Sequence, residues 1–171
     1  LTLPMCSPIS DGGAAAILCS GDALDRFAEA RPVKVHACVL GTGVDRTVEQ
    51  VDRHITHLTA NRAYKAAGLG PRDMSVAEVH DATAIGEVTQ TENLGFCAFG
   101  EGGRLAERGE TAIGGRIPIN PSGGLESKGH PIGATGLAQI HELVGQLRGE
   151  AGPRQVEGAR HAIAENAGGI Y

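Results

Sequence analysis

Residues 120–136 read NPSGGLESKGHPIGATG and form the most informative segment of the chain. His130 lies between Gly129 and Pro131, so its backbone is constrained and its neighbours leave room for a ligand beside the imidazole. Histidine is the side chain best matched to proton transfer near neutral pH. Apolar residues at helical spacing follow, which predicts that the loop leads into a helix. They are Leu137, Ile140, Leu143, Val144 and Leu147.

Two more polar clusters occur at predicted element ends. Residues 76–79 read as a short buried strand, and His80 and Asp81 follow it directly, before a helix predicted to run to about Leu94. Residues 159–164 predict a last strand, followed by a glycine turn at 166–169. Ligands usually bind at the carboxyl ends of strands in open α/β sheets, and a glycine turn there exposes N–H groups that suit an oxyanion.

Each cluster also has a purely structural interpretation. A single histidine is more often a surface residue or a satisfied core residue than a catalytic one, and glycine turns are usually only turns. His80 and Asp81 also suit the start of the next helix, as a cap and as an N-terminal negative charge. The occurrence of all three clusters at predicted strand–helix junctions favours a functional site.

The remaining pattern alternates strands with helices. Residues 14–20 and 33–43 are apolar and predict strands, and an apolar stripe from Val48 to Ala66 predicts a helix that ends at Gly68. Residues 95–116 are interrupted by glycines and show no strong period. The alternation predicts an α/β fold in which helices cover a sheet.

Composition excludes several classes of protein. The 171 residues carry a formal net charge of −5, which lacks the basic footprint of a nucleic-acid binder. No apolar run approaches the roughly 20 residues of a membrane helix. The four scattered cysteines and the absence of a secretory leader predict a reduced, cytoplasmic protein without disulfides. His54 and His57 lie three apart, but no thiol or carboxylate cluster joins them, so no metal site is expected.

The 120–136 loop resembles the signature loop of the thiolase superfamily, and is most similar to the sterol-carrier-protein-type thiolases and thiolase-like lipid-transfer proteins. VHDAT at 79–83 resembles the His-Asp motif of these proteins, and SDGGAA at 10–15 is similar to a turn near the end of their first half. QLRGEAG at 146–152 also fits the family pattern. The match extends over nearly the whole chain.

The resemblance implies a thiolase fold. In that fold, two similar halves build a two-fold αβαβα architecture, each with a mixed five-stranded sheet layered with helices. Residues 1–30 would be the end of the first half, and residues 31–171 the C-terminal domain without its final strand. The missing first half would complete the protein. A homodimer acting on an acyl-CoA substrate is expected, with an OB-fold and zinc-ribbon protein as a further partner.

The same resemblance implies roles for individual residues. His130 would activate a nucleophilic cysteine in the first half and help to form an oxyanion hole, His80 would act at that same hole, and the N–H of Gly168 would serve a second one. The substrate-binding residues would be Asn120, Ser122, Gly129 and Asn166. No cofactor is expected to be bound, because coenzyme A enters as part of the substrate.

The sequence departs from the family where a second, acid/base cysteine is expected. Asn166 occupies its usual position, and Ala82 occupies the alternative one within the His-Asp motif. Asp81 or Tyr171 could substitute, although a tyrosine with a pKa of about 10 needs activation. The leading expectation is an acetyl-CoA acetyltransferase-like enzyme of fatty acid or sterol degradation, inactive as this fragment alone. A thiolase-like aldolase and a non-catalytic acyl-CoA or lipid carrier are the alternatives.

Overall fold

The structure is a computed structural model that describes residues 1–168. The helices are α1 (Ile55–Ala67), α2 (Ala84–Asn93), α3 (Gly102–Glu107), α4 (Gly124–Lys128) and α5 (Ile132–Arg148), and the strands are β1 (Val76–Glu78) and β2 (Ala162–Ala164). Short 3-10 turns occupy Leu3–Met5, Gly21–Arg26, Val51–Arg53, Pro71–Asp73 and Gly152–Arg154.

The two strands form a small parallel sheet. Val76 pairs with Ala162 and Glu78 with Ala164, and an isolated parallel bridge joins Ala77 to Ile119. The α/β class is therefore confirmed, as are the strands predicted at 76–79 and 159–164. The predicted five-stranded sheet is not confirmed, since the described residues form only two strands.

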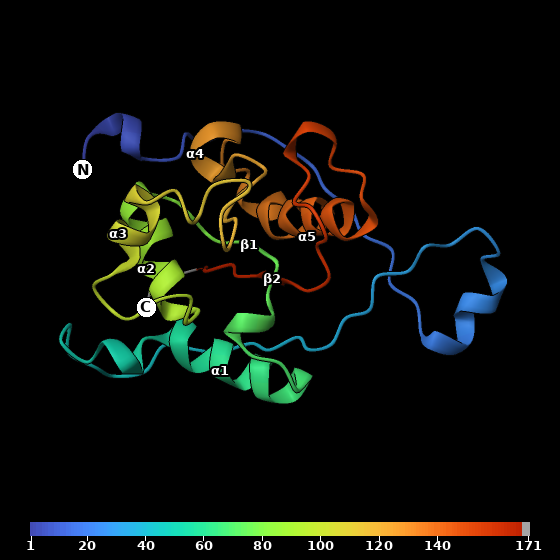
Figure 1. The fold of residues 1–171 in the computed structure, drawn as a ribbon, viewed down its shortest axis with the longest axis horizontal. Helices are drawn as coiled ribbons and strands as arrows, with labels where there is room; N and C mark the ends of the chain where they lie inside the picture. Colours follow the sequence, from blue (N-terminus) through green and yellow to red (C-terminus); the bar gives the residue numbers. More distant parts are fainter. Residues whose placement is uncertain (169–171) are drawn as a thin grey trace.

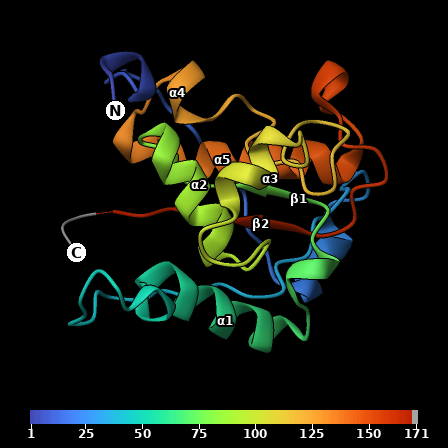
Figure 2. The same ribbon diagram turned by 60° about the vertical axis from the view of Figure 1, so that its left-hand side comes forward.

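Helices lie on both sides of this sheet. In Figure 1, α5 runs above the two strands and α1 lies below them, and the turned view in Figure 2 keeps this order. One core cluster joins α1 and α3 to β1, through Tyr64, Leu105 and Ala77 among others. A second cluster packs Leu143 of α5 against Val76. The layers thus bring the carboxyl end of β1 close to the start of α5.

The strands predicted at 14–20 and 33–43 are wrong for this structure. Both segments lie outside the helices and strands of the described residues, and they expose apolar side chains: Ile17 is 94% exposed and Leu40 is 87% exposed. In Figure 1 they run out to and back from the outlying turn Gly21–Arg26. A strand is stabilised by hydrogen bonds to a neighbouring strand, and these apolar segments have no such neighbour among the described residues.

The predicted helices are found, with shifted ends. Helix α1 begins at Ile55, where the His54 ring accepts from the N–H of Thr56, and it ends at Gly68 with a left-handed φ of 68°. Prediction missed α3, because residues 95–116 lack a helical period, and it missed the five-residue α4, which lies inside the signature loop.

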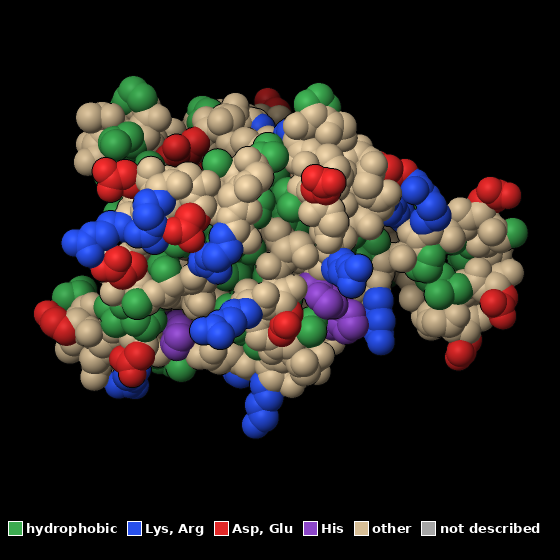
Figure 3. All heavy atoms as spheres, in the orientation of Figure 1, with side chains coloured by type: hydrophobic (Ala, Val, Ile, Leu, Met, Phe, Trp, Pro, Cys, Tyr) green, Lys and Arg blue, Asp and Glu red, His purple; other side chains and the backbone are tan. Residues whose placement is uncertain are grey.

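The visible surface carries charges of both signs. In the face drawn in Figure 3, Lys and Arg side chains alternate with Asp and Glu. Within residues 1–168, no helix combines the length and the apolar character needed to cross a bilayer.

Candidate active site

His80 and His130 face each other across the carboxyl end of β1. Their ring centroids lie 4.8 Å apart with an interplanar angle of 87°, although the residues are 50 positions apart in sequence. His80 follows β1, and His130 precedes α5. Both histidines are half-buried. The structure therefore brings together the two histidines that the sequence singled out.

A threonine fixes the tautomer of His130. The Oγ1 of Thr135 lies 2.8 Å from His130 Nδ1 and 3.1 Å from the carbonyl oxygen of Pro131. Because the carbonyl can only accept, the single hydroxyl hydrogen goes to Pro131 and the hydroxyl oxygen accepts from Nδ1–H. The Nε2 of His130 then keeps its lone pair and is available as a base. The sequence patterns did not single out Thr135. A hydroxyl about one helical turn after a candidate histidine could have indicated a hydrogen bond to its ring.

His80 is held neutral but lacks a partner at one ring nitrogen. Burial, together with the nearby His130, lowers the pKa of His80 below its usual value. Its Nδ1 is enclosed and has no hydrogen-bond partner among the described residues. The other ring nitrogen, Nε2, is therefore the one available for chemistry.

Asp81 points into the protein and caps a helix. The side chain is 3% exposed, and its Oδ1 accepts from the N–H of Leu125 at 2.8 Å, at the start of α4. Gly124 lies so close that a Cβ at this position would collide with the carboxylate. Burial raises the pKa of Asp81. The hydrogen bonds of Asp81 in this structure thus serve the loop that carries His130, and an acid/base role stays a prediction.

Asn120 connects the signature loop to the sheet and to α2. It adopts a left-handed φ of 51°, which asparagine tolerates better than most residues. Its Oδ1 accepts from the N–H of Val79 at 2.8 Å, and its Nδ2 donates to Glu87 at 2.8 Å. Both ends of the Asn120 amide, which the sequence predicted to bind substrate, therefore form hydrogen bonds within the protein.

Replacing Asn120 with alanine is expected to destabilise the domain by about 2–4 kcal/mol. The change leaves the buried N–H of Val79 without an acceptor and places an alanine in a left-handed conformation. Thermal or urea unfolding measures the loss. The matched control is Asn61→Ala on the exposed face of α1, which is expected to stay within about 0.5 kcal/mol of the parent. Equal stabilities for the two variants would contradict this role for Asn120.

Ser122 and Gly129 also serve the loop. Ser122 Oγ donates to the buried Glu78 carboxylate at 2.7 Å and lies 2.6 Å from Lys128 Nζ. Burial raises the pKa of Glu78. Gly129 has a φ of 87° and packs against Ser10 of the N-terminal segment, where a Cβ would collide. Contacts within the protein account for the conformations of Ser122 and Gly129, so their substrate-binding roles stay predictions.

The glycine turn after β2 lies beside α5. Asn166 is exposed, and its Nδ2 donates to Gln139 Oε1 at 3.1 Å. Gly168 is exposed and is the last described residue. Tyr171, predicted as a substitute acid, lies outside the described residues.

The N-terminal segment lies against both histidine motifs, which sequence patterns did not predict. The N–H of Ser7 donates to the carbonyl of Ala82 at 3.0 Å, and the N–H of His130 donates to the carbonyl of Pro8 at 3.0 Å. Cys6 forms an isolated antiparallel bridge with Thr83. A short extended segment thus joins the strand end that carries His80 to the loop that carries His130.

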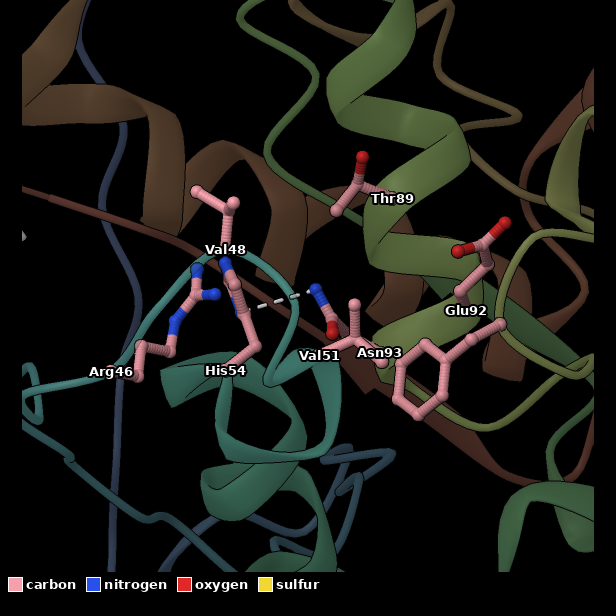
Figure 4. A pocket seen from close by; sticks show the side chains of 8 residues that line it. Arg46, Val48, Val51, His54, Thr89, Glu92 and Asn93 are labelled. Atoms are coloured by element: carbon pink, nitrogen blue, oxygen red, sulfur yellow. Dashed lines mark hydrogen bonds between the residues drawn. The ribbon is translucent and has the colours of Figure 1, made fainter.

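A separate cavity of about 180 Å³ opens at the other end of α2. Figure 4 shows Asn93 of α2 pointing toward His54, to whose Nδ1 it donates at 3.1 Å, with Thr89 on the same helix and Arg46 beside the ring. Burial and Arg46 lower the pKa of His54. Among residues 1–168, no group of three or more His, Cys, Asp or Glu side chains is placed to hold a metal ion.

Comparison with known proteins identifies the family of the chain. Residues 45–171 match the family described as thiolase C-terminal domain-like. The chain is 48% identical to an acetyl-CoA acetyltransferase of Methanothermobacter thermautotrophicus over 99% of its length and 45% of that protein. It is 45% identical to sterol carrier protein 2 of Rattus norvegicus over 98% of its length and 32% of that protein.

A solved structure is similar as well. The complex named Ltp2-ChsH2(DUF35) aldolase matches with a TM-score of 0.57 and 31% identity, over 64% of this chain and 28% of the other. The chain thus spans less than half the length of these relatives. On the match to residues 45–171, the chain belongs to the thiolase C-terminal domain-like family.

Proposed function

We propose that this domain works within a longer thiolase-like enzyme that makes or breaks a carbon–carbon bond on an acyl-CoA thioester. The observation that carries the proposal is the facing pair of His80 and His130 at the carboxyl end of β1, with Nε2 of His130 free to accept a proton. The similarity to an acetyl-CoA acetyltransferase supports an acyltransferase reaction. A pure carrier has no need of two such histidines.

In this proposal His130 is the base that activates the nucleophile. Its Nε2 takes the proton from a cysteine thiol supplied by the rest of the protein. The thiolate attacks the keto carbonyl of a 3-ketoacyl-CoA, the bond between the α and β carbons breaks, and the electron pair passes to the acetyl-CoA enolate. The enolate takes the proton that His130 has gained. The thiol of free coenzyme A then gives its proton to His130 and attacks the acyl-cysteine, so that the acyl group passes to coenzyme A and the cysteine leaves as the thiolate.

His80 would stabilise the negative charge that develops on the thioester oxygen. An N–H donor aimed at a developing oxyanion contributes a few kcal/mol, and Nε2 is the ring nitrogen of His80 available for this role. The N–H of Gly168 is proposed as the donor of a second oxyanion site. Both donors lie beyond a strand of the same small sheet, where ligands of α/β proteins bind.

The proposal extends to the partners and setting of the whole protein. Coenzyme A enters as part of the substrate, and no resident cofactor is required. A homodimer in the cytoplasm is proposed, acting in lipid degradation. The similar aldolase complex is named with a DUF35 component, which supports a second, different subunit as a partner.

A thiolase-like aldolase is the second candidate, and the missing second thiol favours it. Asn166 and Ala82 occupy both positions where the family pattern places that cysteine, and an amide cannot shuttle a proton near neutral pH. An aldolase instead removes the proton of a β-hydroxyl and releases an enolate, without an acyl-enzyme. The similar solved structure is itself named an aldolase.

Turnover assays of the full-length protein test the proposal. Acyltransferase activity predicts thiolysis of a 3-ketoacyl-CoA that depends on added coenzyme A, whereas aldolase activity predicts cleavage of a 3-hydroxyacyl-CoA without it. The isolated 171 residues are expected to turn over neither substrate above the buffer background. Absence of both reactions in the full-length protein, despite tight acyl-CoA binding, would contradict the proposal and favour a carrier.

A further inference from the structure

Glu165, the residue before the glycine turn, bonds to the backbone of His80. Its Oε2 accepts from the N–H of His80 at 2.9 Å, and its Oε1 accepts from the hydroxyl of Thr56 in α1 at 3.4 Å. Its own backbone is fixed as well: its N–H donates to Glu78 O at 2.8 Å, and its carbonyl accepts from Gln139 Nε2 at 2.9 Å. One carboxyl group thus joins β2, α1 and the strand end that carries His80.

The ring of His80 depends on this backbone for its orientation. A functional histidine is usually oriented by a hydrogen bond at the ring nitrogen that does not react. Nδ1 of His80 has no such partner among the described residues. The hydrogen bond from the His80 N–H to Glu165 therefore restrains the backbone of a residue whose ring has no hydrogen bond at Nδ1 among the described residues.

Among residues 1–168, the carboxyl group of Glu165 forms no salt bridge. Thr56 from α1 and Gln139 from α5 are uncharged, and Glu78, whose backbone carbonyl accepts from the Glu165 N–H, directs its own carboxylate to Ser122 and Lys128. His80 is the titratable group on the facing strand end, and it is kept neutral by burial and by His130. Burial accordingly raises the pKa of Glu165 to about 7.

We propose that Glu165 is a positioning residue for His80, and that its bond to the His80 N–H tightens when the carboxyl group is ionised. A carboxylate is the stronger acceptor, so loss of the proton strengthens this bond. A glutamine could make both contacts but could not titrate, which distinguishes the role from simple space filling. The inference rests on the proposed role of His80 in acyl-CoA chemistry.

The amide signal of His80 tests the bond directly. In full-length protein labelled with ¹⁵N-histidine, the His80 amide is assigned by its loss in His80→Asn, and its proton shift is followed from pH 5 to 9. We expect a downfield movement with a midpoint near pH 7, absent in Glu165→Gln and retained in the control Glu157→Gln, whose residue is exposed. An amide shift that titrates identically with and without Glu165→Gln would overturn the proposal.

Kinetics test the positioning role separately. Glu165→Leu, which removes both side-chain bonds, is expected to lower kcat about 10–100-fold with KM nearly unchanged, because the loss affects the reacting oxygen and not the binding of coenzyme A. Glu165→Gln is expected to keep kcat within a few-fold. An unchanged kcat in a folded Glu165→Leu protein would refute positioning. Absence of turnover in the parent protein and in every variant would refute the proposed function. If the His80 amide still titrated, its hydrogen bond to Glu165 would remain established.

Discussion

His130→Ala in the full-length protein is expected to lower kcat by about 10²–10⁴-fold. The change removes the only proposed base for the nucleophile, and general-base catalysis by a positioned side chain typically contributes that much. The tautomer set by Thr135 makes the expectation specific, because Nε2 is the nitrogen left free. Steady-state rates with saturating acyl-CoA measure the effect.

His141→Ala is the matched control for this variant. His141 lies on the exposed face of α5, the helix that begins just after His130. Its replacement is expected to leave kcat and the melting temperature nearly unchanged. A His130→Ala protein that folds and retains more than a tenth of the parent rate would refute the role of His130.

His80→Ala is expected to lower kcat by about 10²–10³-fold. Loss of one oxyanion donor has an effect of this size in other enzymes. Because burial and His130 lower the pKa of His80, the imidazole stays in its neutral form across the neutral range, and its donor strength is expected to stay constant there. The measurement is kcat between pH 6 and 9, with the folded state checked by circular dichroism.

The double variant shows whether the two histidines act together. Residues that act as a unit are strongly non-additive, so a unit formed by His80 and His130 predicts a double variant little slower than His130→Ala alone. Independent, multiplying losses would indicate that His80 and His130 serve different steps. A His80→Ala protein with the parent kcat would contradict an oxyanion role outright.

Local patterns predicted much of this domain. The apolar stripes of α1 and α5 and the short buried run of β1 have clear periods, so sequence alone predicted these elements. The two histidines were predicted from their positions at strand–helix junctions, and the structure places their rings 4.8 Å apart. Glycine at position 68 correctly marked the end of α1.

What could not be predicted depends on contacts between distant residues. Residues 14–20 and 33–43 have the composition of strands, but composition does not supply the neighbour that a strand requires. Glu165 looks like an ordinary charged residue until the fold brings Thr56 and the His80 backbone to its carboxyl group. Likewise, the sequence did not predict that the side chains of Asn120 and Ser122 bond to Glu87 and Glu78, and their substrate-binding roles stay predictions.

Covalent labelling of the complete protein distinguishes the acyl-enzyme mechanism from its alternatives. The protein is incubated with a short acyl-CoA carrying an isotope in the acyl group, and the digest is mapped by mass spectrometry. We predict an acyl group on one cysteine in the part of the protein that precedes this chain, and a large loss of labelling in His130→Ala. Tight acyl-CoA binding without any labelled cysteine would contradict the acyl-enzyme mechanism and leave the aldolase or the carrier.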